Sequence, residues 1–247
     1  MAEPALSKPF IHLRLHTEFS ISDGLVTIPA LINSLHQLHM PAVAITDVSN
    51  LFGLIKFYSG AAKSGIKPIC GVDVLVENEE GVRSRIVLLV KNRTGYLNLT
   101  NIISALYTDS ETHGEPVLAL DSLDGMTEGL IALSGAQSGD IGIELLGDDF
   151  EQAKTLLSRW QSLFPDSFYL ELQRVGKVDE EAYIERAVNL AIESQCPVIA
   201  TNDVRFIEQE DFDAHEVRVC INERRELDDP RRPHNYTEQQ YLKSIYV

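Results

Sequence analysis

Histidine, arginine and aspartate side chains recur at the ends of short apolar runs, where such groups could hold metal ions or move protons. These side chains are His12, Arg14, His16, Asp23, Asp47, Asp73, Arg85, Asp203 and Arg205. In α/β folds, functional groups collect at the carboxyl ends of strands and in the loops that follow. Asp73 is the most informative because it interrupts the apolar run ICGVDV, and a buried carboxylate is costly unless it is paired or bound to a cation. His16 and Asp203 follow the same logic, since both close expected strands that face the same end.

Three of these side chains alternate along one expected strand. His12, Arg14 and His16 are spaced two residues apart, so an extended chain places all three on one face. Asp47 ends the run AVAIT, and a carboxylate in that position is as well explained as a helix cap or turn former as by a function.

The other histidines and the cysteines favour structural roles. His215 lies in the helical pattern DAHEVRVCI and is expected to be a partly buried histidine with satisfied hydrogen bonds. Cys70 and Cys220 are expected to be small core residues, because neither has an evident base nearby. The histidines expected to lie in solvent are His36, His39, His113 and His234.

Short β-rich runs alternate with longer amphipathic segments, which predicts an α/β fold. The seven expected strands span residues 10–16, 42–46, 67–76, 85–91, 129–134, 168–172 and 197–201. The expected helices span residues 28–38, 51–63, 96–106, 151–163, 180–193 and 237–244. The link 77–84 is too short for a crossover helix and predicts an antiparallel hairpin, so a regular eightfold barrel does not fit. An open doubly wound sheet and a closed barrel both stay open at this point.

A change in composition near residue 222 suggests a domain boundary. Residues 1–222 are expected to form one domain, and residues 223–247, which include the proline-containing stretch LDDPRRPHN, are expected to form a linker toward a further domain.

Composition narrows the class of function. The 247 residues carry 21 Lys and Arg against 37 Asp and Glu, a formal net charge of −16, which argues against this segment alone wrapping a phosphate backbone. No apolar run is long enough to span a bilayer, and the first residues lack the features of a signal peptide. Three widely spaced cysteines, Cys70, Cys196 and Cys220, fit neither a disulfide framework nor a zinc knuckle, so a reducing cytoplasm is expected.

Several ordered segments resemble the polymerase-and-histidinol-phosphatase (PHP) domain, and more closely the PHP domains that open the alpha (catalytic) subunits of bacterial DNA polymerase III. The resemblance covers roughly residues 10–244 and is carried by HLRLHTEFSISDGL, AVAITDVSNLFGLIKFY, GIKPICGVDV, LLVKNRTGYLNL, GLIALSG and PVIATNDVRFIEQEDFDAHEV. It implies a distorted seven-stranded β/α barrel. In active members of the family it also implies a cluster of zinc or manganese ions.

The resemblance can be carried over one ligand position at a time. Plausible ligands stand at His16, Asp23, Asp73 (an aspartate where the family has glutamate) and Asp203. The family's other ligand positions are replaced by Arg14, Val48, Arg85, Ala136 and Arg205. A guanidinium is always protonated and has no lone pair to give, so it cannot ligate a cation.

These replacements predict a site without catalytic residues. In it, three arginines form ion pairs with the remaining aspartates and so stabilise the fold. Charge-assisted bidentate pairs would neutralise Asp23, Asp73 and Asp203. No cofactor is expected in this domain. At most one weakly bound divalent metal would be held by His16, Asp23 and Asp203.

The resemblance implies a scaffold and docking module within a replicative polymerase. The implied partners are the polymerase core of the same chain, the proofreading exonuclease (epsilon) subunit and the rest of the polymerase III holoenzyme. DNA would be contacted only through the full-length protein, and no membrane is involved. The alternatives are an active metal-dependent phosphoesterase or 3′–5′ proofreading exonuclease, and an adaptor protein unrelated to replication.

Overall fold

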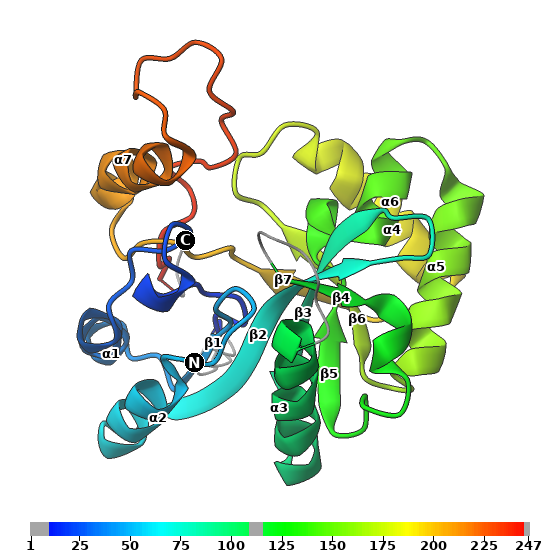
Figure 1. The fold of residues 1–247 in the computed structure, drawn as a ribbon, viewed down its shortest axis with the longest axis horizontal. Coiled ribbons are helices and arrows are strands. Elements are labelled where there is room, and N and C mark those ends of the chain that lie inside the picture. Colours follow the sequence, from blue (N-terminus) through cyan, green and yellow to red (C-terminus); the bar gives the residue numbers. More distant parts are fainter. Residues whose placement is uncertain (1–9, 109–115, 245–247) are drawn as a thin grey trace, which may run out of the picture.

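A curled seven-stranded sheet forms the centre of the protein, and helices cover its outside (Figure 1). The structure is a computed structural model and describes residues 10–108 and 116–244. The strands are β1 (Ala42–Ile45), β2 (Lys67–Glu77), β3 (Arg83–Val90), β4 (Val117–Ala119), β5 (Leu130–Leu133), β6 (Phe168–Gln173) and β7 (Val198–Thr201). The expected α/β class and the curled, distorted barrel are confirmed.

The sheet runs in the order β1-β2-β3-β5-β6-β7, with β4 paired to β2. The pairs β2/β3 and β3/β5 are antiparallel, and the other pairs are parallel. The short link between β2 and β3 is therefore a hairpin, as its length predicts. This hairpin breaks the regular βα repeat, which is why the sheet is not an ordinary eightfold barrel.

Seven helices and four short 3-10 turns connect the strands within the described residues. The helices are α1 (Ile28–Gln37), α2 (Leu54–Lys63), α3 (Arg93–Thr108), α4 (Asp140–Leu146), α5 (Phe150–Leu163), α6 (Glu180–Glu193) and α7 (Phe212–Glu223). The 3-10 turns are η1 (Glu18–Ser20), η2 (Leu120–Leu123), η3 (Ala136–Ser138) and η4 (Gln209–Asp211).

Apolar side chains on the outer face of the sheet pack against α3 to α6. Val72, Val74 and Leu88 alternate outward and join Trp160, whose ring stacks on Phe168 with ring centres 5.8 Å apart. On the inner face a smaller cluster includes Ala44, Val87, Leu89 and Leu133. Because side chains alternate along a strand, Asp73, opposite Val87 in β3, faces this interior.

The expected strand at residues 10–16 is wrong as a regular strand. This segment is extended but forms only an isolated bridge between Leu15 and Val204. The His12 carbonyl accepts from the amide of Ala44 in β1, and the Leu15 carbonyl accepts from Thr46 just after β1. The Val204 carbonyl accepts from the amide of His16. The segment lies between a four-residue strand and a bent stretch of chain, so it finds scattered hydrogen bonds instead of a continuous ladder. β4, which the sequence pattern did not predict, makes the seventh strand.

The expected helix at residues 237–244 is also wrong. This stretch contains a turn at 238–239, and Tyr241 forms a parallel bridge with Phe206. The side chain of Gln240 explains the difference, because its amide oxygen accepts from the backbone N–H of Thr237 and its amide nitrogen donates to Asp203. The domain boundary at residue 222 stays a prediction.

Candidate functional site

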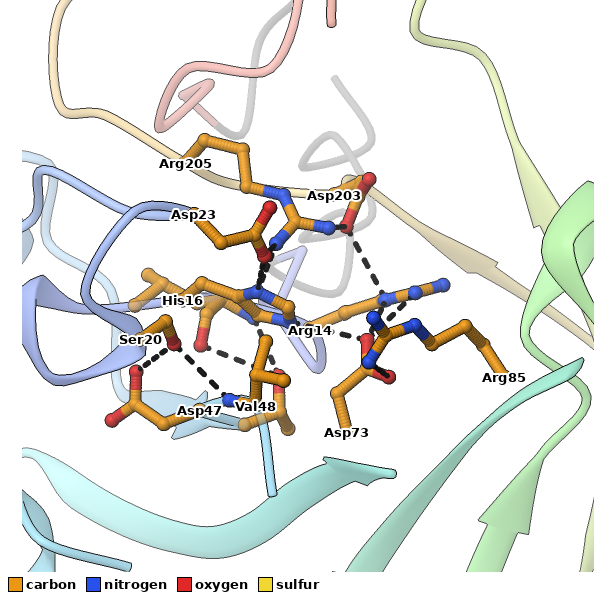
Figure 2. A network of polar contacts seen from close by, with 12 residues as sticks. Arg14, His16, Ser20, Asp23, Asp47, Val48, Asp73, Arg85, Asp203 and Arg205 are labelled. Atoms are coloured by element: carbon orange, nitrogen blue, oxygen red, sulfur yellow. Dashed lines mark hydrogen bonds and ion pairs between the residues drawn. The ribbon is translucent and has the colours of Figure 1, made fainter. Parts of the chain in front are cut away.

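A cluster of charged side chains lines a pocket of about 660 Å³ on the inner face of the curled sheet (Figure 2). The residues come from every side of the barrel: the extended segment 12–17, the loop after η1, β2, the first residues of β3, β6, and the chain just after β7. They are Arg14, His16, Asp23, Asp73, Arg85, Glu171, Asp203 and Arg205. The structure therefore brings together the sequence-predicted residues that carry charge, with the exception of His12 and Asp47.

Arg14 holds three carboxylates at once. Its Nη2 and Nε donate to Asp73 Oδ2 at 2.7 and 3.1 Å, and Nε lies 3.2 Å from Asp203 Oδ1. Its Nη1 donates to Glu171 Oε2 at 3.3 Å. The Arg14 side chain is only 4% exposed, so these contacts replace nearly all of its hydration. Arg14 is thus a bridge between strands and not one half of a single bidentate pair.

Arg205 is the second bridge. Its Nη1 donates to Asp23, and its Nη2 donates to Asp203 Oδ1 at 2.8 Å. The expected charge-assisted contacts between arginines and leftover aspartates are present, but each guanidinium is shared among several carboxylates. Arg85 lies at the open side, 24% exposed, with Nη1 3.6 Å from Asp73 Oδ1.

The cluster shifts the pKa values of its three aspartates downward. Burial acts to raise the pKa of Asp73, but the Arg14 guanidinium, the His16 hydrogen bond and Arg85 hold it well below its usual range. The pKa of Asp23 is lowered by Arg205 and His16 against the same burial effect. The pKa of Asp203 is lowered by Arg205, Arg14 and Lys177, again against burial. All three carboxylates are therefore ionised at neutral pH.

His16 lies at the centre of the cluster and has both ring nitrogens engaged. Its Nδ1 contacts Asp23, and its Nε2 is 3.1 Å from Asp73 Oδ2. Burial and the charge of Arg205 act to lower its pKa, but Asp23 and Asp73 outweigh them, so the pKa of His16 is raised above its ordinary value. His16 thus bridges two carboxylates, whose charge favours its protonated form, while Arg205 also contacts its Nδ1 and disfavours that form.

Asp47 has a structural role here. Its carboxylate accepts from the Thr17 backbone N–H at 2.6 Å, from the Thr17 hydroxyl and from the Ser20 hydroxyl at 2.6 Å. In Figure 2 its side chain points to Ser20, away from Asp73 and the arginines. Asp47 holds the turn that carries Asp23 toward Arg205, which is the turn-forming alternative of the sequence analysis.

We expect Asp47→Ala to lower the free energy of unfolding by about 2–4 kcal/mol. The change leaves the buried Thr17 and Ser20 donors without an acceptor, and each unsatisfied buried donor costs about 1–3 kcal/mol. Urea denaturation followed by circular dichroism measures this loss. Glu18→Ala, on the same turn but partly exposed, is the control and should change stability by less than about 0.5 kcal/mol. Equal losses in the two variants would contradict this role.

Two replaced positions carry no polar side chain toward the cluster. Val48 donates its backbone N–H to the Ser20 hydroxyl at 3.1 Å and forms a bridge with Asp73. Ala136 is buried in η3 with a positive φ of 52°. Neither side chain could ligate a cation.

The structure adds four residues that the sequence analysis missed. They are Glu171, Lys177, Tyr236 and Gln240. Glu171 had a usable signal, because it interrupts the apolar run FYLELQ just as Asp73 interrupts its own strand. Lys177 lies 3.4 Å from Asp203 Oδ2, and nothing in its loop sequence indicates that contact. Tyr236 and Gln240 lie in a stretch that was expected to be a linker.

His12 is buried but does not join the cluster. Its Nε2 bonds to the backbone carbonyl of Lys243 at 2.8 Å, and burial lowers its pKa to about 4. His215 is fully buried between the rings of Phe206 and Tyr236.

The remaining histidines and cysteines largely follow expectation. His36, His39 and His234 are exposed, whereas His113 lies outside the described residues. Cys196 and Cys220 are buried, Cys70 is half-buried, and all three are free.

The donor set does not fit the metal cluster that the resemblance implies. Guanidinium groups stand at three positions where the resemblance implies ligands. One carboxylate oxygen of each of Asp23, Asp73 and Asp203 already accepts from an arginine. Both nitrogens of His16 face carboxylates. Within residues 10–108 and 116–244, no group of three or more His, Cys, Asp and Glu side chains has an arrangement that could hold a metal ion. In that same part of the chain, no helix is both long and apolar enough to cross a membrane.

Comparisons with known proteins agree with one another. The sequence pattern of the PHP domain matches residues 12–175. The DNA polymerase III subunit alpha of Pseudomonas aeruginosa is 51% identical over 237 residues, which are 95% of this chain and 20% of the relative. That of Escherichia coli K12 is 44% identical over 246 residues, 99% of this chain and 21% of the relative. The chain thus spans about a fifth of the length of the curated relatives that it matches.

Solved structures share the fold at low sequence identity. An amidohydrolase from Chromobacterium violaceum is 16% identical with a TM-score of 0.54, covering 79% of this chain and 87% of that one. A protein assigned as a metal-dependent phosphoesterase from Bifidobacterium adolescentis is 13% identical with a TM-score of 0.53, covering 79% and 88%.

Proposed function

This chain belongs to the PHP domain family, and from that premise we propose that it is a structural and docking domain of a DNA polymerase III alpha subunit whose ancestral hydrolytic site has become an ion-pair core. The likeness of nearly the whole chain to two alpha subunits supports the parent protein. The loss of hydrolysis is supported by one observation: Arg14 and Arg205 bridge buried carboxylates at positions where the resemblance implies metal ligands.

Electrostatics explains why arginine can take this place. Metal-dependent hydrolysis uses bound cations to lower the pKa of a water molecule and to stabilise the leaving oxygen. Arg14 and Arg205 supply positive charge to the same carboxylates but offer no coordination site. They therefore keep the acids ionised and the strands together without generating a nucleophile. His16, Asp23, Asp73 and Asp203 are former ligand positions in this proposal, and the domain has no catalytic residue.

The acidic exterior supports an accessory role within a larger polymerase. A net charge of −16 disfavours DNA contact by this segment, so DNA would be bound by other parts of the full-length protein. In this proposal the domain packs against the polymerase core of its own chain and offers a docking surface to the proofreading exonuclease subunit. Polymerase activity belongs to the parent protein.

Metal content and hydrolysis test the proposal directly. We expect the purified chain to contain less than stoichiometric zinc, manganese and iron by elemental analysis. We also expect it to hydrolyse neither p-nitrophenyl phosphate nor the 3′ end of single-stranded DNA faster than buffer with added Mn²⁺. Two or more bound metals per chain together with metal-dependent turnover would overturn the proposal and favour an active phosphoesterase or exonuclease.

A single weak metal is tested on the same samples. It would be held by His16, Asp23 and Asp203, where Arg205 now donates to both carboxylates. Arg205 and a metal ion would compete for these two carboxylates. We therefore expect Arg205→Met to increase the affinity for Mn²⁺ relative to the unchanged chain. Tight binding to the unchanged chain that Arg205→Met does not alter would contradict an arginine-filled site.

A further inference from the structure

Residues 236–243, here called the strap, return to the ion-pair cluster after a long excursion. After α7 the chain runs through the mostly exposed residues 224–235 as a long loop (Figure 1). Residues 236 and 240 then contact the cluster again. Leu242 of the strap is 4% exposed and joins an apolar cluster that also includes Leu15 and Val204. The strap is therefore part of the folded body although its sequence is polar.

The first strap contact is made by Tyr236. Its hydroxyl donates to Asp23, and its ring packs edge-on against His215 with ring centres 4.6 Å apart. The Arg205 guanidinium lies 5.9 Å from the centre of the same ring. Tyr236 thus supplies a further hydrogen bond to Asp23, one of the two carboxylates that Arg205 bridges.

The second contact is made by Gln240, which is fully buried. Its side-chain nitrogen donates to Asp203 Oδ2 at 2.8 Å, on the opposite oxygen from that held by Arg205. The Gln240 backbone carbonyl accepts from the backbone N–H of Arg205 at 2.8 Å. Gln240 therefore supplies a further hydrogen bond to Asp203, the other carboxylate that Arg205 bridges.

The far end of the strap is anchored outside the cluster. The amide of Leu242 donates to the Phe206 carbonyl at 3.1 Å, and the side chain of Asn202 donates to the Tyr241 carbonyl at 2.6 Å. His12 holds the carbonyl of Lys243. The strap consequently runs alongside the residues that follow β7, which themselves carry Asp203 and Arg205.

We propose that the strap and the ion-pair cluster are conformationally coupled. The strap docks only when the cluster is intact, and displacing the strap opens the cluster. This inference rests on the proposal that the cluster is structural. Tyr236 and Gln240 supply donors to buried carboxylates, so lifting the strap leaves Asp23 and Asp203 short of hydrogen bonds. In return, loss of a bridging arginine removes the charge balance that keeps those acceptors in place. Any partner that draws the strap away thereby loosens the cluster about 200 residues back along the chain, at Arg14 and His16.

Hydrogen exchange of the 247-residue chain tests the coupling. The reporters are the amides of His16, bonded to Val204, and Leu25, bonded to the Arg205 carbonyl; neither bonds to the strap. We expect Tyr236→Phe and Gln240→Leu each to speed exchange at both reporters at least 10-fold. Glu238→Ala, an exposed change within the strap, should leave both rates unchanged, as should amides of α5 in every variant.

The reverse direction uses Arg14→Lys, which keeps the charge at a side chain whose ion-pair partners, Asp73, Glu171 and Asp203, all lie outside the strap. Faster exchange at the amide of Leu242 in this variant supports the coupling. Faster exchange at Leu242 in the strap variants, with wild-type rates at His16 and Leu25, would overturn it, because the strap would then open by itself. Metal content of the same samples separates the two proposals: stoichiometric metal would overturn the structural role of the cluster, whereas uncoupled exchange would overturn the coupling alone.

Discussion

Replacing Arg14 with methionine should lower the free energy of unfolding by about 3–5 kcal/mol, the loss typical of breaking one partner of a buried ion pair. Arg14 is 4% exposed and contacts Asp73, Glu171 and Asp203, so its removal leaves buried carboxylates undercompensated. For a domain of this size each kcal/mol lowers the melting temperature by about 2–4 °C. Thermal and urea denaturation of the purified variant measure both quantities.

The matched control is Arg174→Met. Arg174 forms a two-armed pair with Glu181 of good geometry, but both side chains are about 70% exposed. Water screens such a pair, so this change should destabilise the protein far less than Arg14→Met. If Arg14→Met were no more destabilising than Arg174→Met, the structural role of the cluster would be wrong.

Acid should unfold this protein steeply, beginning from about pH 5 downward. The folded-state pKa values of Asp23, Asp73 and Asp203 are all lowered, whereas an unfolded aspartate titrates near 3.9. Their stabilisation is therefore complete above the unfolded pKa and is lost as the pH falls through the folded pKa values. Each proton bound only by the unfolded chain costs about 1.4 kcal/mol per pH unit, so three carboxylates give a slope of up to about 4 kcal/mol per pH unit.

His16 affects how the stability of the protein changes as the pH rises. Its pKa is raised in the folded state, so its contribution is complete below the unfolded value of about 6.5 and is lost as the pH rises through the folded value. Burial lowers the pKa of His12 to about 4, so the folded state loses stability through this residue as the pH falls below about 6.5. Together these effects place the stability maximum near about pH 6.5. Urea titrations from pH 3.5 to 8 measure the curve.

Asp203→Asn tests whether acid unfolding is caused by the cluster or by the many other acidic residues of the chain. The variant removes one strongly shifted carboxylate, so its stability should fall less steeply between pH 5 and 3.5, by up to about 1.4 kcal/mol per pH unit. Asp121→Asn, at an exposed pair with Arg159, should leave the slope unchanged. Parallel slopes for Asp203→Asn and the unchanged chain would show that the cluster does not control acid unfolding.

Residue type and local spacing determined much of the site in advance. A guanidinium cannot ligate a metal in any fold, so Arg14, Arg85 and Arg205 already predicted an ion-pair core wherever those positions met. Asp73 within an apolar strand predicted a buried partner, and Glu171 offers the same signal in β6. Short apolar, β-rich runs likewise predicted six of the strands, since burial on two faces leaves continuous apolar runs in the sequence.

Tertiary structure decided what local patterns do not encode. Residues 10–16 have the alternation of a strand but no continuous neighbour, so they form a bridge instead of a ladder. Residues 237–244 have helix-forming residues, yet Gln240 gains more from Asp203 and from the amide of Thr237 than from a helical turn. The contact between Tyr236 and Asp23 joins residues 213 positions apart. The sequence by itself determined which charges this protein would have to neutralise. Only the tertiary fold decided which residues neutralise these charges, because such contacts exist only after distant segments are brought together.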